Sequence, residues 1–151
     1  MPIRMRVLAA VLAASAVVAC KKKEAPQPIV ETPAAPAVPA TLSVTDVQIG
    51  SAIGADMKVT APKTTFGVKD TIYAAVLTDG APPSATITAV WTYTRGGKTV
   101  TVDSTAKTIA PTGPATTEFH VSKPGGWPAG TYHVAIWADG QSAGTRDFDV
   151  K

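Results

Sequence analysis

The chain is expected to fold as an all-β domain, a two-layer antiparallel sandwich of about seven short strands. After residue 40, threonine, valine, isoleucine and aromatic residues dominate in short runs. No 11-residue stretch keeps the apolar spacing of an amphipathic helix, and Gly, Pro and Asp-Gly turns interrupt the runs at short intervals. A chain of 151 residues has room for one such domain, at 41–151, and a tail.

Residues 85–94 give the clearest strand pattern. Apolar residues occupy one face and threonines most of the other, the apolar row being Ala85, Ile87, Ala89, Trp91 and Tyr93. Gly-Gly at 96–97 then suits a two-residue hairpin turn. Pairing residue 95 with 98 places Tyr93 opposite Val100 and Trp91 opposite Val102, so that apolar side chains meet on one face.

The remaining strands are predicted at 42–49, 71–78, 115–121, 130–138 and 145–150. Asp-Gly at 139–140 indicates a second hairpin between the last two. Strict two-residue pairing here turns Phe148 and Val150 to the wrong face. One extra residue corrects the alternation, and we therefore predict a β-bulge or a longer loop near Ala143 and Gly144.

The segment Gly-x-Tyr at 130–132 resembles the tyrosine corner of immunoglobulin-like domains, and Trp91 resembles their core tryptophan. The resemblance covers roughly 71–151 and implies an immunoglobulin-like sandwich with Trp91 and Tyr132 in its core. The usual cysteine pair is missing, so this space is expected to be filled by Ala74, Val76 and Val134. Trp-Pro-x-Gly-x-Tyr before a final Phe-x-Val is similar to small domains of proteobacterial lipoproteins of unassigned function. Such a resemblance implies architecture and not activity.

Residues 1–19 are predicted to be a signal peptide. Two arginines precede an apolar run at 7–19 that ends in small residues. Thirteen residues of helix span only about 20 Å, less than the ~30 Å hydrocarbon core, so a permanent transmembrane helix is the weaker interpretation.

Val-Val-Ala-Cys at 17–20 resembles the lipobox of bacterial lipoproteins. The resemblance implies cleavage before Cys20, lipid on its thiol and an acylated (palmitate-bearing) amino terminus in the cell envelope. Lys21 stands where an aspartate favours inner-membrane retention in enterobacterial lipoproteins, which favours the outer membrane, facing the periplasm. The alternative is an ordinary signal peptide with a stray cysteine. Cys20 is the sole cysteine, so no intramolecular disulfide is expected.

A Pro/Ala-rich tether is predicted at 20–40, where five prolines disfavour regular structure. It serves either as a passive stalk or as a spacer that reaches a partner. Lys21, Lys22 and Lys23 either lie against anionic headgroups or simply keep the segment soluble.

The net charge of +3 comes from the first forty residues, because the span 41–151 holds nine bases and nine acids. A neutral domain lacks the basic footprint of a nucleic-acid binder, and we expect no nucleic-acid partner.

No catalytic, cofactor or metal site is expected. The two histidines, His120 and His133, have no other ligand at metal-binding spacing, although Glu118 shares a strand face with His120. No Gly-x-Ser-x-Gly elbow is present, and Asp147 and Asp149 alternate with an apolar residue as in a half-exposed strand.

Trp127 and Trp137 are the candidates for contact with an envelope protein or glycan, since an exposed aromatic suits either partner. In the alternative, Trp127 caps the end of the sandwich and Trp137 is covered by a neighbouring strand. The sequence thus favours a lipid-anchored envelope protein with a non-catalytic binding or structural role, of undefined oligomeric state. The alternatives are an accessory subunit of a larger envelope complex and a periplasmic metal-binding or enzymatic protein.

Overall fold

A computed structural model describes residues 40–151 and confirms the all-β fold. No helix long and apolar enough to cross a membrane occurs in this part of the chain. The predicted signal peptide, the lipidated Cys20 and the tether lie outside the described residues, apart from Ala40. The strands are β1 (Ser43–Gly50), β2 (Thr65–Phe66), β3 (Ile72–Asp79), β4 (Ala85–Arg95), β5 (Lys98–Ile109), β6 (Ala115–Val121), β7 (Gly130–Ala138) and β8 (Gln141–Val150).

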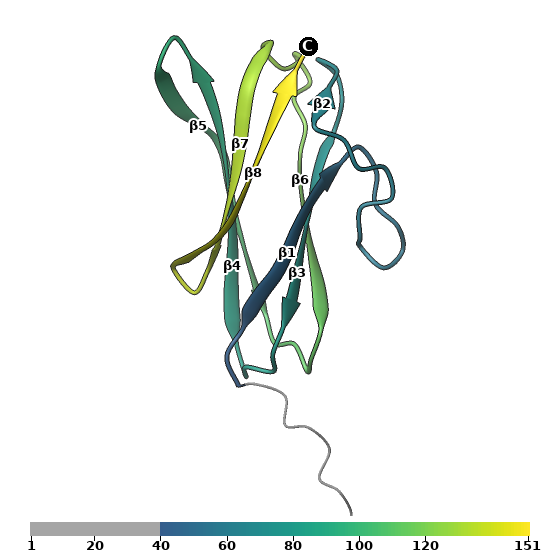
Figure 1. Ribbon diagram of the computed structural model, residues 1–151, viewed down its shortest axis with the longest axis vertical. Coiled ribbons are helices and arrows are strands. Elements are labelled where there is room, and N and C mark those ends of the chain that lie inside the picture. Colours follow the sequence, from purple (N-terminus) through teal and green to yellow (C-terminus); the bar gives the residue numbers. More distant parts are fainter. Residues whose placement is uncertain (1–39) are drawn as a thin grey trace, which may run out of the picture. The chain divides into compact units, whose positions relative to one another are not determined.

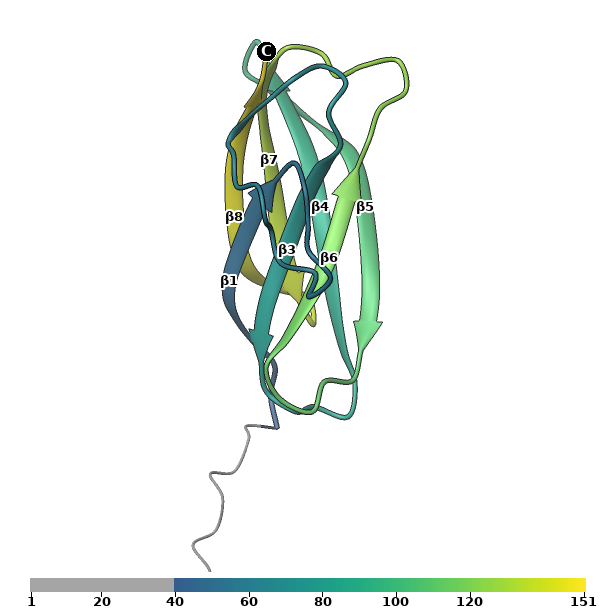
Figure 2. The same ribbon diagram turned by 90° about the vertical axis from the view of Figure 1, so that its right-hand side faces the viewer.

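The strands form two sheets that pack face to face. One sheet has the order β1-β3-β6 and the other has the order β2-β8-β7-β4-β5. In Figure 1, β4, β5, β7 and β8 lie on one side of the molecule and β1, β3 and β6 on the other; Figure 2 shows the three-stranded sheet in front. Neighbouring strands are antiparallel, except that β2 runs parallel to β8. This is an immunoglobulin-like arrangement, with one strand, β5, added to the sheet beyond β4.

The core lies between the sheets and contains the residues that alternate inward on each strand. Trp91 of β4 is buried and lies opposite Val134 of β7 in the register. Ala74 and Val76 on β3 face this layer and are fully buried, as is Val134. Three small apolar side chains therefore occupy the region where a cysteine pair bridges many immunoglobulin-like domains.

The predicted hairpin between β4 and β5 is confirmed near its turn and wrong further along. Residue 95 pairs with 98 and Tyr93 pairs with Val100, but Trp91 lies opposite Asp103. Val102 is the extra residue in a β-bulge, so the expected pair of Trp91 with Val102 does not form. The strand runs on to Ile109 as an edge strand, and most of its residues are exposed.

The predicted irregularity between β7 and β8 is confirmed. Ile136 pairs with Gly144 and Trp137 pairs with Ser142, which leaves Ala143 as the bulged residue. The bulge restores the inward direction of Phe148, which is buried. A Cβ atom on Gly144 would lie 3.1 Å from Cγ2 of Val47, so a glycine here allows β1 to pass close to β8.

Tyr132, at the start of β7, connects the core to the loop before the strand. Its hydroxyl donates a hydrogen bond to the carbonyl oxygen of Pro128, 2.8 Å away, which is the geometry of a tyrosine corner. Its ring stacks on Phe148 at 5.4 Å and on Tyr93 at 4.6 Å between centroids. Burial raises the pKa of Tyr132, with a smaller contribution from Tyr93.

Replacing Tyr132 by phenylalanine is expected to destabilise the domain. Tyr132→Phe keeps the ring but leaves the Pro128 carbonyl without this donor, which should lower the free energy of unfolding by about 1–2 kcal/mol. Urea denaturation followed by near-ultraviolet circular dichroism measures the change. The matched control is Tyr93→Phe, which removes a more exposed bond to the Ala129 carbonyl and should cost about 0.5 kcal/mol or less. Equal losses for both variants would contradict the special role of Tyr132.

Candidate functional site

Trp127 does not present the aromatic contact surface considered for it. The side chain is only 4% exposed and packs edge-on against Tyr132. Its indole Nε1 donates to the carbonyl oxygen of Asp70 at 2.9 Å, and its backbone N–H donates to the carbonyl of Val68. Trp127 therefore closes one end of the sandwich and ties the loop 122–129 to the loop 67–71.

Trp137 remains accessible on the outer face of the five-stranded sheet, with 39% of its surface exposed. Its cross-strand neighbours are Thr88 on β4 and Ser142 on β8, and Ala135 precedes it on the same face. All of these neighbours are small and uncharged. An indole among small neutral side chains is suited to contact with another molecule.

The two histidines lie in different parts of the structure, and each pairs with a carboxylate. His120 Nδ1 lies 2.6 Å from Oε1 of Glu118, the residue that shares its strand face, and His133 Nδ1 lies 2.5 Å from Oδ1 of Asp147. No group of three or more histidine, cysteine, aspartate or glutamate residues suited to hold a metal ion occurs within residues 40–151.

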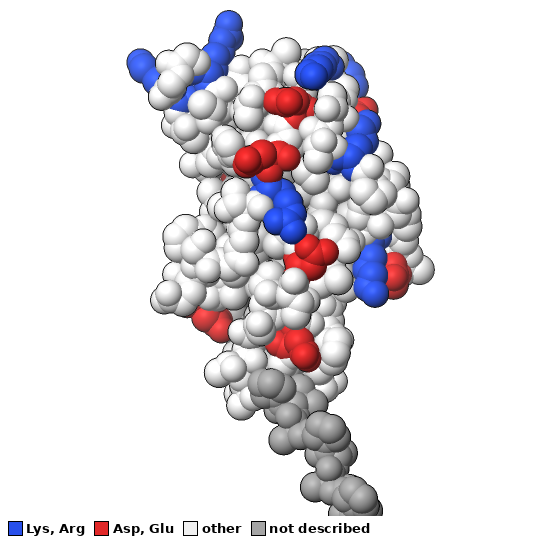
Figure 3. All heavy atoms as spheres, viewed as in Figure 1, with Lys and Arg blue, Asp and Glu red and all other residues white. Residues whose placement is uncertain are grey.

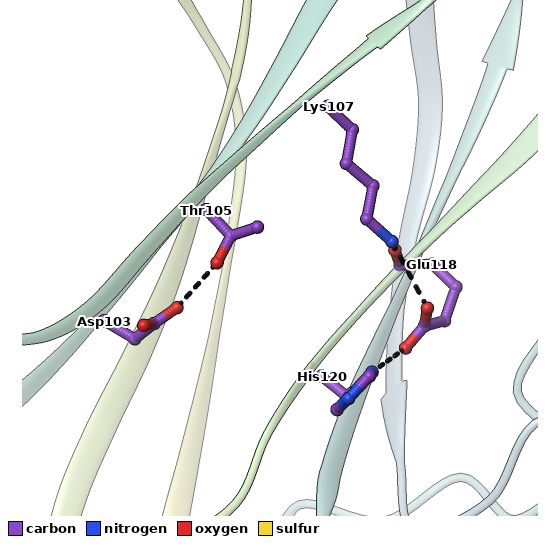
Figure 4. A network of polar contacts seen from close by, with 5 residues as sticks. All are labelled: Asp103, Thr105, Lys107, Glu118 and His120. Carbon is purple, nitrogen blue, oxygen red and sulfur yellow. Dashed lines mark hydrogen bonds and ion pairs between the residues drawn. The ribbon is translucent and has the colours of Figure 1, made fainter.

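A row of polar side chains connects the edges of the two sheets, where β5 and β6 border the same open side of the sandwich (Figure 2). Glu118 of β6 binds His120 on one side and Lys107 of β5 on the other, where Nζ lies 3.4 Å from Oε2 (Figure 4). Lys107 also donates to the backbone carbonyl of Glu118. Further along β5, the Thr105 hydroxyl donates to Asp103 at 2.9 Å. Lys107 therefore joins two sheet edges and neutralises a half-buried carboxylate.

A surface groove lies between β5 and the loop 122–129. One part has a volume of about 340 Å³ and includes Asp103 and His120 in its lining; the other has about 280 Å³ and includes Tyr93 and Val100. The two parts share Val102, Lys123 and Trp127 in their linings and therefore adjoin one another. Val100 and Val102 are 55% and 36% exposed, which makes the β5 wall of the groove apolar and accessible.

The neutral charge count conceals an uneven distribution along the fold. At the end that carries the β4–β5 turn, the segments 67–71, 95–98 and 122–129 together carry four bases (Lys69, Arg95, Lys98 and Lys123) and one acid, Asp70. At the opposite end, the segments 79–84, 110–114 and 139–140 carry Asp79 and Asp139 but no base. Figure 3 shows most of the blue side chains toward the first end, where some red ones lie among them, and red ones alone at the other end. The fold thus forms a basic end from loops that are far apart in the sequence.

Sequence reasoning missed this groove and its basic rim. Val100 and Val102 fit an alternating strand and were expected to lie opposite core residues, so nothing marked them as surface. Lys123 stands alone in a glycine- and proline-rich loop. Its nearness to β5 depends on the packing of Trp127, which no local pattern reveals.

No family model matches the chain, and no curated protein matches its sequence. Among solved structures, an immunoglobulin-like protein from Pseudomonas aeruginosa aligns with 74% of this chain and 98% of its own, with a TM-score of 0.49 and 11% identity. A beta-glucosidase involved in saponin metabolism, from intestinal bacteria, aligns with 74% of this chain, with a TM-score of 0.49 and 15% identity. An alkylpurine DNA glycosylase from Pseudomonas fluorescens, bound to DNA containing an abasic site analogue, aligns with 74% of this chain, with a TM-score of 0.45 and 10% identity. The chain spans 16% and 31% of these two enzymes, respectively.

Asp70 holds the loop that seats Trp127, and its stability contribution is expected to depend on pH. The Gly67 N–H donates to its carboxylate, as does Lys63, each at 3.0 Å, and the Gly67 bond is the larger cause that lowers the pKa of Asp70. Since the folded-state pKa lies below the unfolded one, this contribution is complete above about pH 4 and is lost as the pH falls through the folded-state value.

Asp70→Asn should therefore lower the urea midpoint at neutral pH, and the difference from wild type should shrink as the pH falls below about 4. Urea denaturation across this pH range measures the difference in midpoint. The control is Asp56→Asn, which changes an exposed loop residue. A difference between wild type and Asp70→Asn that stays constant with pH would contradict the assignment.

Proposed function

We propose that this chain is a bacterial cell-envelope lipoprotein, held to a membrane by lipid on Cys20, whose immunoglobulin-like domain has a non-catalytic binding or structural role. The observation that carries the proposal is the lipobox-like Val-Val-Ala-Cys at the end of the apolar run 7–19. Two or more acyl chains on one residue make anchoring stable, whereas a single chain does not. Lysine rather than aspartate at 21 supports an outer-membrane location facing the periplasm.

The chemistry of the domain supports binding rather than catalysis. An activated hydroxyl nucleophile needs a base that a third group orients. The Thr105 hydroxyl donates to Asp103, and no other side chain within residues 40–151 bonds this carboxylate. Both carboxylate oxygens of Glu118 are already engaged, Oε2 by Lys107 and Oε1 by His120. Trp137 and the groove beside β5, in contrast, are open to a partner. An envelope protein or a glycan suits these surfaces.

Removal of the Cys20 thiol is expected to release the protein from the membrane. Cys20→Ser leaves no thiol for lipid transfer, so the variant should move out of the membrane fraction and lose palmitate labelling. The domain should keep its β-rich circular dichroism and its urea midpoint, because residues 41–151 contain no cysteine. Fractionation of cells that express either chain, with mass spectrometry of the amino-terminal peptide, measures both effects.

Lys21→Asp is the matched control, since it keeps the cysteine. It should remain lipidated and, in an enterobacterial host, shift toward the inner membrane. Wild-type protein recovered wholly soluble and without lipid would overturn the anchor. A substrate turned over by the purified protein, with activity lost in Glu118→Gln, would overturn the non-catalytic role.

A further inference from the structure

We propose that the free edge of β5 binds an extended, acidic segment of a partner protein by strand addition, with alternate apolar side chains of that segment entering the groove beside it. This inference rests on the proposed binding role and names its surface and its partner chemistry. Four features of the structure support it: an unpaired strand edge, an apolar groove wall, a basic rim, and a bulge and a lysine that prevent pairing along the rest of the edge.

The edge of β5 presents free backbone groups near the β4–β5 turn. β5 is the last strand of its sheet and pairs with β4 alone. A two-residue hairpin closes on a hydrogen-bonded pair, here residues 95 and 98, and bonded pairs alternate with non-bonded ones along the ladder. Thr99 and Thr101 therefore direct their N–H and C=O groups away from β4, toward the open side. A row of unpaired groups of this kind is a template for an incoming strand.

The groove lies beside this part of the edge. Val100 and Val102 form its wall on β5, and Tyr93 and Trp127 lie deeper in the lining. In an added strand, every second side chain points to the same face as Val100, toward the groove, and the others point to solvent. The 280 Å³ part of the groove accommodates one or two apolar side chains of ordinary size. An extended peptide with alternating apolar residues fits this geometry.

The rim of the groove selects for acidic residues. Lys98 begins β5, Arg95 faces it across the turn, and Lys123 lines both parts of the groove. The acid in the lining, Asp103, accepts a hydrogen bond from Thr105 and lies beyond the bulge. Lys98 and Arg95 share the groove face of the sheet with Val100, and Lys123 lines the groove, so the three bases attract a peptide of net negative charge.

The same bases disfavour a second copy of this chain. Two β5 edges that met here would bring like charges together, which costs free energy at an interface. The bulge at Val102 bends the strand, and Lys107 reaches across to the carbonyl of Glu118 on β6. Lysines and bulges protect edge strands from indiscriminate pairing. The open stretch is consequently short, from Lys98 to Thr101, and suits a peptide rather than a whole sheet.

Binding of a defined probe peptide tests the inference. The probe is a fluorescein-labelled heptapeptide of alternating glutamate and valine, titrated with the full chain in mild detergent and followed by fluorescence anisotropy. We expect saturable binding that weakens with salt, and no binding of the lysine–valine counterpart. In ¹⁵N-labelled protein, the amides of Thr99 and Thr101 should gain protection from hydrogen exchange when the probe is bound.

Two variants separate the edge from the charge. Thr101→Pro removes a backbone N–H that points away from β4, so it breaks no bond to that strand. It should weaken binding of the probe by about tenfold or more. Lys123→Glu should weaken it by about fivefold, while Lys58→Glu, an equal charge change in an exposed loop away from the groove, should leave it unchanged. If Thr101→Pro fails to fold, as judged by circular dichroism, Lys123→Glu and the exchange data still decide.

Equal binding of the glutamate–valine and lysine–valine peptides would overturn strand addition by an acidic peptide. So would binding of dextran sulfate, a polyanion without a peptide backbone, at the strength of the probe and without protection of the Thr99 and Thr101 amides. Self-association of the chain through β5 in sedimentation, in place of peptide binding, would overturn it in favour of a second copy. These outcomes leave the lipid anchor untouched, because Cys20→Ser should bind the probe as wild type does. Failure of the anchor and failure of this inference are therefore distinguishable.

Discussion

Apolar packing between the two sheets is the constraint on which the rest of the structure depends. Residues 41–151 contain no cysteine, so the two sheets have no covalent bridge. Trp91, Val134 and the small buried residues of β3 supply the contact instead. A fully buried valine such as Val76 or Val134 contributes about 1.5–3 kcal/mol from the hydrophobic effect. A cysteine-free core also leaves Cys20 as the sole thiol, which is consistent with its proposed use for lipid.

Tyr132 extends this core to one end of the sandwich. Its ring packs between Phe148 and Tyr93, and its hydroxyl holds the backbone just before β7. Trp127 packs on the same ring and bonds the loop that contains Asp70. This chain of contacts positions Lys123 and the groove wall opposite β5. The candidate binding surface is thus a consequence of core packing, even though its own residues are exposed.

On the open side of the sandwich, the edges of β5 and β6 are joined by polar contacts along one stretch and separate along another. Lys107 joins β5 to β6 through the Glu118 side chain and carbonyl, so this stretch is closed to pairing. Between the β4–β5 turn and the bulge at Val102, no hydrogen bond within the described residues joins Thr99 or Thr101 to β6. Bulge and lysine together confine the accessible edge to the basic end. Edge protection and partner selection therefore arise from the same features.

The sequence by itself determined the class of fold, most strand positions and both hairpin turns, because alternation and turn residues are local signals. It also predicted the bulge at Ala143, since apolar side chains on the wrong face reveal an odd residue. The bulge at Val102 escaped this test because β5 is a polar edge strand, where either face tolerates the same residues. The burial of Trp127, the basic end and the groove were decided by tertiary structure alone. They depend on loops separated by tens of residues that meet only when the two sheets pack.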